Sequence, residues 1–289
     1  MDDHHIKLLL KILLVFLSGG RASEGARVFT IVNYCKTTIW PGITPGDSFD
    51  GGGFALKPGE SAVFTAPVGW IGRIWGRTGC DFDSDGSGSC QTGACGSALK
   101  CGASGQTPAT LAEFTLAPLD FYDVSLVDGF NLPVTLTPVN ARGGNCSAAG
   151  CDGDLRENCP SDLAIKVDGE TVACRSACDV FNTDEYCCRG AFGNPDTCRP
   201  TYYSEIFKQA CPGAYSYAYD DPTSIFTCTD ADYIVSFCSN FKSKKQKVQR
   251  VCTYHINKLV CSASPGRASS IWKWLVVLLL CFTSLWSSL

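Results

Sequence analysis

Histidine is almost missing from this chain of 289 residues, which contains only three. His4 and His5 lie at the start and His255 lies near the end, so residues 26–238 have none. Nucleophilic mechanisms of the Ser-His-Asp or Cys-His type need an imidazole, as do most zinc sites outside cysteine clusters. The sequence therefore excludes these mechanisms for residues 26–238 and leaves carboxylates for acid–base chemistry.

Charged side chains are also scarce, at 18% of the chain, and acids outnumber bases. Residues 239–262 contain lysine and arginine but no acid, which makes the preceding body strongly acidic. An acidic body argues against nucleic acid as a partner. We interpret residues 239–264 as a solvated basic stalk, with contact to anionic headgroups as the alternative. No phosphate-cradling loop precedes a helix, and no cofactor or metal is expected.

Long apolar runs occur only at the two ends of the chain. The first, from Leu8 to Leu17, is bordered by Lys7, contains Lys11 and ends in small residues. It is too short for a spanning helix, which needs roughly 20 residues. Residues 1–25 are therefore predicted to be a secretory signal peptide.

The second apolar run, from Trp274 to Trp286, ends the chain without a following basic segment. A stretch of small and polar residues precedes it. These features are typical of a glycosylphosphatidylinositol attachment signal, with attachment at Ser262 or Ser264 and removal of residues 265–289. A conventional spanning helix is the alternative. We expect a protein anchored to the outer face of the plasma membrane.

Cysteine and glycine are abundant, with 19 and 29 residues. So many cysteines indicate an oxidising compartment, because a cytosolic pool would keep such thiols reduced. From Arg27 to about Val139, short segments of β-forming residues alternate with Gly- and Pro-rich turns, which favours a β-sandwich. After Gly143 the chain becomes cysteine-dense and loop-rich, so cross-links must provide much of its stability. One helix is predicted there, beginning after Thr201.

Acidic residues interrupt two predicted strands between residues 110 and 130. Glu113 lies in the middle of the first strand, Asp123 in the middle of the second, and Asp128 begins the turn that follows. Acids are depleted in strands, so their presence needs a reason. Either they lie on a face exposed to solvent, or they line a groove.

Seven motifs carry a resemblance to a known family. They are FTIVNYC at 29–35, GRIWGRTGCDFDSDGSGSCQTGACG at 72–96, PATLAEFTL at 108–116, DFYDVSLVDGFNLPV at 120–134, EYCCRG at 185–190, YYSEIFKQACPGAYSYAYDDPTSIFTC at 202–228 and VSFC at 235–238. Together they resemble the thaumatin-like family of class-five pathogenesis-related proteins over about residues 27–238. The resemblance implies a mainly β fold. Residues 26–145 and 212–238 would form a β-sandwich, and residues 146–211 a partly helical, disulfide-rich subdomain.

The resemblance also implies eight disulfides. Cys252, Cys261 and Cys281 lie outside this set; Cys252 and Cys261 are candidates to pair in the stalk, and Cys281 would leave with the tail. Ala94 stands where the family usually has an acid, which questions a contact within that loop. The implied pairs are Cys35–Cys238, Cys80–Cys90, Cys95–Cys101, Cys146–Cys228, Cys151–Cys211, Cys159–Cys174, Cys178–Cys187 and Cys188–Cys198.

An acidic cleft is the site that the resemblance implies. Asp221 is preferred over Asp220 as its last member, although the sequence leaves that choice open. The aromatic residues Phe121, Tyr122 and Tyr219 lie near the acids in sequence and are candidates to stack on sugar rings. The cleft residues are Arg73, Glu113, Asp123, Asp128 and Asp221.

The expected function is that of a secreted or cell-surface plant defence protein, monomeric and antifungal, which binds β-1,3-glucan or other cell-wall glycans. One alternative is a weak endo-β-1,3-glucanase that uses Glu113 with a second carboxylate, Asp123 first among the candidates, followed by Asp128 and Asp221. Another is a non-catalytic structural or signalling role. Asn145 begins a formal glycosylation sequon, although a disulfide at its middle residue would often block its use.

Overall fold

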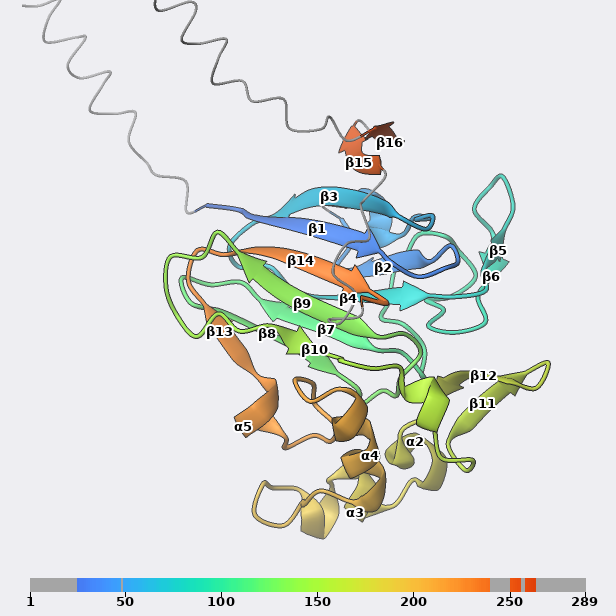
Figure 1. Cartoon of the computed structure of the whole chain (residues 1–289), viewed down its shortest axis with the longest axis vertical. Helices are drawn as coiled ribbons and strands as arrows, with labels where there is room; N and C mark the ends of the chain where they lie inside the picture. The colour runs from blue at the N-terminus through green and yellow to red at the C-terminus, as the bar shows by residue number, and fades with distance from the viewer. Residues whose placement is uncertain (1–24, 48, 240–249, 256–257, 264–289) are drawn as a thin grey trace, which may run out of the picture.

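The computed structural model describes residues 25–47, 49–239, 250–255 and 258–263 (Figure 1). Residues 1–24 of the predicted signal peptide, the predicted C-terminal anchor signal, Ser264 and Cys281 lie outside the described residues. Among the residues that are described, no helix is both long and apolar enough to cross a bilayer.

One sheet of the fold is organised around strand β1 (Arg27–Asn33). Phe29 and Ile31 are fully buried and alternate with more exposed neighbours, the pattern of a strand with one face in a core. β1 pairs in parallel with β14 and antiparallel with β3. The order of this seven-stranded sheet is β10 (Ala149–Gly150), β9 (Val134–Val139), β14 (Asp232–Phe237), β1, β3 (Glu60–Ala66), β15 (Arg250–His255) and β16 (Lys258–Ala263).

The second sheet contains the two strands on which the sequence places its acids. In β7 (Leu111–Thr115), Ala112 and Phe114 are buried in the core, and Glu113 belongs to the opposite face, as the alternation predicts. The order of this five-stranded sheet is β13 (Phe226–Cys228), β8 (Asp120–Ser125), β7, β4 (Ile71–Arg77) and β2 (Trp40–Thr44).

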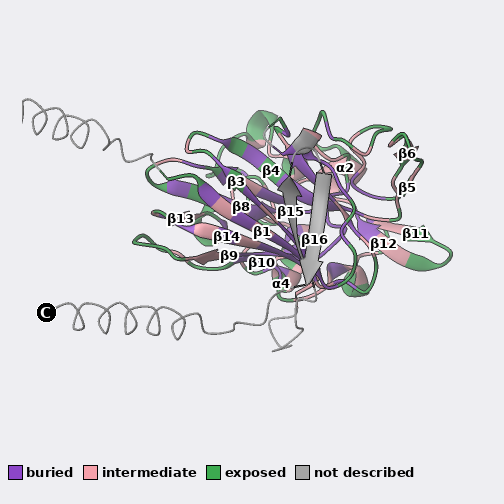
Figure 2. Ribbon diagram, turned by 90° about the horizontal axis from the view of Figure 1, so that it is seen from above, coloured by how far each residue is buried: buried purple, intermediate pink, exposed green. Residues whose placement is uncertain are grey.

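Aromatic rings fill the core between the two sheets, where buried residues are concentrated (Figure 2). Phe114 packs edge-to-face against Phe29 and Tyr233, with ring centroids 4.9 and 5.2 Å apart. A buried ion pair ties the sheets together: Arg27 Nε donates to Asp120 Oδ2 over 2.8 Å, and the Tyr233 hydroxyl donates to the same oxygen over 3.0 Å. The predicted mainly β, two-sheet fold is therefore confirmed.

Loops between β4 and β7 cover one end of the outer face of the five-stranded sheet. Trp75 lies beneath them, fully buried, and its indole donates to the Gly93 carbonyl over 2.8 Å. These loops hold the short strands β5 (Asp81–Phe82) and β6 (Gly88–Ser89). Ala94 accepts from the Gln106 amide through its carbonyl over 2.7 Å. The loop at Ala94 thus has a backbone contact that needs no acid.

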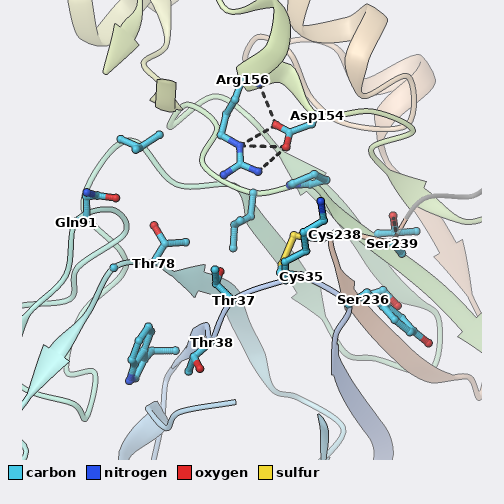
Figure 3. A pocket seen from close by; sticks show the side chains of 18 of the residues that line it. Cys35, Thr37, Thr38, Thr78, Gln91, Asp154, Arg156, Ser236, Cys238 and Ser239 are labelled. Carbon is cyan, nitrogen blue, oxygen red and sulfur yellow. Dashed lines mark hydrogen bonds and ion pairs between the residues drawn. A yellow bond between two sulfur atoms is a disulfide. The ribbon is translucent and has the colours of Figure 1, made fainter. Parts of the chain in front are cut away.

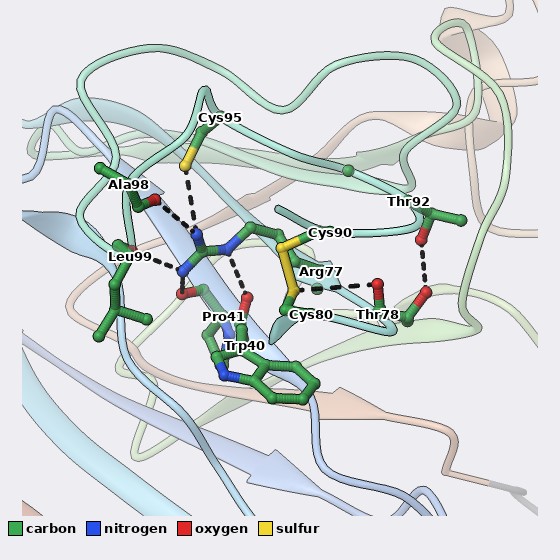
Figure 4. Close-up of a disulfide and its surroundings, with 12 residues drawn as sticks. Trp40, Pro41, Arg77, Thr78, Cys80, Cys90, Thr92, Cys95, Ala98 and Leu99 are labelled. Carbon is green, nitrogen blue, oxygen red and sulfur yellow. Dashed lines mark hydrogen bonds between the residues drawn. A yellow bond between two sulfur atoms is a disulfide. The ribbon is translucent and has the colours of Figure 1, made fainter. Parts of the chain in front are cut away.

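Arg77 holds the same loops through hydrogen bonds from its guanidinium (Figure 4). Its guanidinium donates to the carbonyls of Trp40, Leu99 and Ala98 over 2.9, 2.8 and 3.3 Å. The side chain is fully buried, and burial lowers the pKa of Arg77 to about 10. No described acid forms an ion pair with it, so carbonyl dipoles and the ring of Phe82, whose centroid lies 5.4 Å from Arg77 Cζ, compensate the cation.

The disulfide-rich subdomain lies below the sandwich in Figure 1. The predicted helix is α4 (Tyr202–Ala210), and Thr201 caps it in a reciprocal pair of hydrogen bonds with Ser204. Phe207 on its apolar face is buried in the main core. The other elements of the subdomain are η2 (Leu155–Asn158), β11 (Ala164–Val167), β12 (Glu170–Cys174), α2 (Ala177–Phe181), α3 (Asp184–Cys187) and η3 (Gly190–Phe192). Outside residues 146–211 lie the short helices η1 (Asp50–Gly52) and α5 (Asp221–Ser224).

Eight disulfides cross-link the body, and they are the pairs that the family resemblance implies. The first joins the end of β1 to the end of β14 across 203 residues of sequence, which ties the two ends of the body together. The pairs are Cys35–Cys238, Cys80–Cys90, Cys95–Cys101, Cys146–Cys228, Cys151–Cys211, Cys159–Cys174, Cys178–Cys187 and Cys188–Cys198.

Within the segment interpreted as a stalk, the structure has a hairpin of β15 and β16. β15 pairs in parallel with β3, so the hairpin extends the seven-stranded sheet at its edge. The sequence reasoning missed these strands because it gave more weight to the basic composition of residues 239–250 than to the β-forming residues that follow.

Candidate functional site

Three charged side chains form a row across the outer face of the five-stranded sheet. Arg73 of β4 is the register partner of Glu113 in β7, and Glu113 is the register partner of Asp123 in β8. Direct partners in antiparallel strands share a face, so all three residues lie side by side. Arg73 Nε contacts Glu113 Oε1 at 2.6 Å, and both side chains are partly exposed.

Asp123 is the most perturbed group in this row. Its Oδ1 atom is buried and has no hydrogen-bond partner among the described residues. Burial is the main cause that raises the pKa of Asp123 to about 8; the charges of Glu113 and Asp221 also raise it, and Arg73 opposes the shift. Asp123 is therefore mostly protonated at neutral pH and offers an O–H donor beside the Arg73–Glu113 ion pair.

Tyr215 completes the site and was missed by the sequence reasoning. Its amide donates to the Val124 carbonyl and its own carbonyl accepts from Leu126, both over 2.8 Å, so this residue lies against the end of β8. Its hydroxyl donates to Asp221 Oδ1 over 2.8 Å. Burial, followed by this hydrogen bond, raises the pKa of Tyr215. The sequence feature that could have pointed to Tyr215 as a site residue is the tyrosine-rich run before Asp220.

The structure distinguishes the two adjacent acids that the sequence left open. Asp220 is buried and accepts from Lys208 Nζ over 2.9 Å and from the amide and hydroxyl of Ser216 over 3.0 and 2.9 Å. Asp221 is exposed at the start of α5 and acts electrostatically on Asp123. Asp220 thus holds the chain in place, and Asp221 is the acid that adjoins the row.

No contact among the described residues links the side chain of Asp128 to the charged row. It lies in the turn beyond β8, where its carbonyl accepts from the Ala109 amide over 3.0 Å. Its side chain forms no hydrogen bond or ion pair with another described residue, and its charge is not among the causes that shift the pKa of Asp123. Contacts and electrostatics thus connect Arg73, Glu113, Asp123 and Asp221, while the place of Asp128 in the cleft stays a prediction.

An apolar row runs beside the charged one. Ile71 of β4, Thr115 of β7 and Phe121 of β8 are register partners, two residues further along the same strands and therefore on the same face. Ile71 is 67% exposed and Phe121 is 42% exposed, which is unusual for large apolar side chains. The outer face therefore presents an apolar row, in which Ile71 and Phe121 flank Thr115, beside the charged row. We call the two rows together the cleft floor, after the cleft that the family resemblance implies.

Two other aromatic candidates lie elsewhere. Tyr122 points into the core, fully buried, and its hydroxyl donates to the Ser147 carbonyl over 2.5 Å. Its neighbour Phe121 faces the other side because successive strand residues alternate. The Tyr219 hydroxyl donates to the Gly193 carbonyl over 2.9 Å in the disulfide-rich subdomain. Tyr122 is therefore corrected from a stacking candidate to a core residue.

A separate groove of about 1100 Å³ lies against strands β9 and β14 of the seven-stranded sheet (Figure 3). Its wall includes the hydroxyl residues Thr135 and Ser236 and the Asp154–Arg156 ion pair, and the Cys35–Cys238 disulfide lines it. None of the predicted cleft acids lines this groove. The described residues contain no group of three or more metal-ligating side chains.

The comparisons with known proteins agree with one another. The model of the thaumatin family matches residues 33–239. Pathogenesis-related thaumatin-like protein 3.5 of Cryptomeria japonica is 52% identical over 235 residues, which span 80% of this chain and 98% of that protein. Pathogenesis-related protein 5 of Arabidopsis thaliana is 53% identical over 232 residues, which span 78% and 96%. The solved structure of a family 64 laminaripentaose-producing β-1,3-glucanase from Paenibacillus barengoltzii shares the fold, with a TM-score of 0.51 at 14% identity over 74% of this chain and 75% of that one.

Proposed function

This chain belongs to the thaumatin family, and from that membership and the two rows of the cleft floor we propose that it is a secreted plant defence protein that binds β-1,3-glucan or a related cell-wall glycan. The observation that carries the proposal is the exposed apolar row beside the charged row. A sugar ring has an apolar face and an edge of hydroxyl groups, and this surface offers a partner for each. The proposed biological effect is antifungal.

The contacts fit a neutral, polyhydroxylated ligand. Phe121 can stack on a sugar face, while the Arg73–Glu113 pair and the protonated Asp123 offer donors and acceptors to hydroxyls. Strands in a sheet lie about 4.8 Å apart, so a row across β4, β7 and β8 spans about 10 Å. That length suits an oligosaccharide segment better than a single sugar.

Retention on insoluble β-1,3-glucan tests the proposal. Asp123→Ala and Phe121→Ala should each weaken retention about fivefold to tenfold, the loss of one hydrogen bond or one stacking contact. Glu170→Gln is the matched control, because this exposed carboxylate lies on the β11–β12 hairpin outside the cleft floor. Equal retention of all three variants would overturn the cleft as the binding site.

The raised pKa of Asp123 favours a second candidate, weak endo-β-1,3-glucanase activity. A glycosidase needs a protonated acid next to a second carboxylate, and the carboxyl groups of retaining enzymes lie about 5 to 5.5 Å apart. Direct cross-strand partners such as Glu113 and Asp123 have Cβ atoms about 4.5 to 5.5 Å apart. In this proposal Asp123 would be the acid and Glu113 the nucleophile, and the product would keep its anomeric configuration.

One variant separates binding from hydrolysis. Asn at position 123 has a donor and an acceptor, as a protonated acid does, but has no proton to give to a leaving group. Asp123→Asn should therefore keep glucan retention at neutral pH and lose any release of reducing ends. Release of reducing ends at the wild-type rate would exclude Asp123 as the acid.

We further propose that a lipid attached at Ser262 or Ser264 holds the protein on the outer face of the plasma membrane. The apolar tail behind the small residues supports this proposal. Phosphatidylinositol-specific phospholipase C should release the protein from intact cells, whereas retention after treatment would favour a spanning helix. Asn145 is exposed, next to the Cys146–Cys228 disulfide, and its glycosylation stays a prediction that a mass shift with peptide N-glycosidase checks.

A further inference from the structure

Two of the three cysteines that the eight disulfides leave over are register partners in the C-terminal hairpin. Cys252 in β15 pairs with Cys261 in β16. Direct partners in antiparallel strands have Cα atoms about 4.5 or 5.5 Å apart, depending on which kind of pair they form. Disulfides bridge Cα separations of about 4.4 to 6.8 Å. Both kinds of pair are therefore compatible with a disulfide.

The hairpin needs such a cross-link more than the rest of the sheet does. A two-stranded hairpin is marginally stable by itself in water. This one is joined to the body through the pairing of β15 with β3 at four positions, from Arg250 opposite Glu60 to Thr253 opposite Val63. Cys252 is the register partner of Ala62 in β3 as well as of Cys261 in β16, so the position of such a cross-link lies within the paired part of the hairpin.

We propose that Cys252 and Cys261 form a ninth disulfide, which locks the hairpin as the added edge of the seven-stranded sheet. Each thiol loses its proton and the two sulfurs join. The two electrons pass to the disulfide of a thiol–disulfide oxidoreductase of the secretory pathway, which becomes a dithiol. The sixteen other cysteines of the body are already paired with one another, so these two have no competing partner there.

With the disulfide formed, β15 and β16 belong to the sheet edge and not to a solvated stalk. β16, the last strand of the seven-stranded sheet, ends at Ala263. β15 also covers the edge of β3, whose backbone would otherwise be open to pairing with another chain. If a lipid is attached as proposed above, it would hold this sheet edge near the membrane.

Peptide mapping tests the disulfide directly. The full chain is secreted from a eukaryotic cell, alkylated without reduction and digested with trypsin. Cleavage after Arg250 and after Lys258 separates the two cysteines, one into the peptide Val251–Lys258 and the other into the peptide that begins at Leu259. These peptides should be recovered as one linked species, from protein that runs as a monomer on a non-reducing gel, and reduction should split it. Alkylation of both cysteines, or linkage found only in a dimer, would overturn the proposal.

Hydrogen exchange tests whether the disulfide holds the hairpin in place. In the double variant Cys252→Ser/Cys261→Ser, the amides of β15 should exchange on the order of tenfold faster or more, because closing a short loop restricts the open form by at least that factor. The amides of β1 and β14, which the Cys35–Cys238 disulfide ties together, are the internal control and should not change. Unchanged exchange in β15 would show that the hairpin does not depend on this bond. A single Cys252→Ser change should leave a reactive thiol at Cys261, and its failure to react with a thiol reagent would also count against the pair.

Discussion

Glu113 and Asp123 are direct partners across β7 and β8, yet Arg73 forms its ion pair with Glu113 and leaves Asp123 Oδ1 without a hydrogen bond among the described residues. Two adjacent acids therefore have different environments. Glu113 is compensated by a cation, whereas Asp123 is half-buried beside a like charge, and its pKa is raised to about 8, mainly by burial. This difference gives the cleft floor a neutral donor and an ion pair side by side.

The raised pKa of Asp123 should make the stability of the protein depend on pH. A folded-state pKa raised to about 8 from 3.8 stabilises the fold at low pH, and this contribution is lost as the pH rises through about 8. The wild type should therefore lose stability relative to Asp123→Asn between about pH 5 and 8, by at least about 1.4 kcal/mol, the equivalent of one pKa unit. Thermal unfolding of both proteins across this range measures the difference. Parallel stability curves would mean that Asp123 is ionised in the fold.

Glucan binding should depend on the protonation state of Asp123 as well. If the protonated Asp123 donates to a sugar hydroxyl, retention on β-1,3-glucan should fall as the pH rises through about 8. Asp123→Asn cannot ionise, so its retention should stay level over that range. A wild-type profile as flat as that of the variant would remove Asp123 from the contacts with the ligand.

The adjacent acids Asp220 and Asp221 should separate stability from binding. Asp220→Asn breaks the partly buried pair with Lys208 and should cost about 1–3 kcal/mol of stability. Asp221→Asn removes an exposed charge and should change stability by less than about 0.5 kcal/mol. Because Asp221 adjoins the charged row, the same change should weaken the retention on glucan. Denaturant unfolding and the glucan retention assay on both variants provide the test. A reversed pattern would mean that Asp220 is the cleft acid.

The alternation of residues predicted which side chains share a face of β7 and β8, and so placed Glu113 and Asp123 outside the core. It could not predict register, which depends on strands far apart in sequence; only the structure shows that Arg73 lies opposite Glu113. A shift of one residue reverses the face, and for this reason Phe121 belongs to the cleft floor whereas Tyr122 belongs to the core. The family resemblance supplied Asp221 from a distant segment, but the role of Tyr215 depends on a hydrogen bond that no local pattern encodes.

Arg77 provides a last prediction, because it is a buried cation with no described ion-pair partner and donates to several carbonyl groups (Figure 4). The planar guanidinium donates in several directions at once, to the carbonyls of Trp40, Ala98 and Leu99. A lysine ammonium keeps the charge but cannot reach the same acceptors in that fork geometry. Arg77→Lys should therefore cost about 2–4 kcal/mol, from unpaired carbonyls and a poorly compensated charge.

Arg73→Lys is the matched control for this change, because it makes the same substitution four residues earlier in β4 at a partly exposed ion pair. Such pairs contribute about 0–1 kcal/mol, so stability should hardly change. Denaturant unfolding of the two variants measures the contrast. Equal losses would mean that the loops between β4 and β7 are held by their disulfides, Cys80–Cys90 and Cys95–Cys101, with no need of the guanidinium. A larger loss of stability in Arg77→Lys would show that the hydrogen bonds from the guanidinium to the carbonyls hold these loops in place.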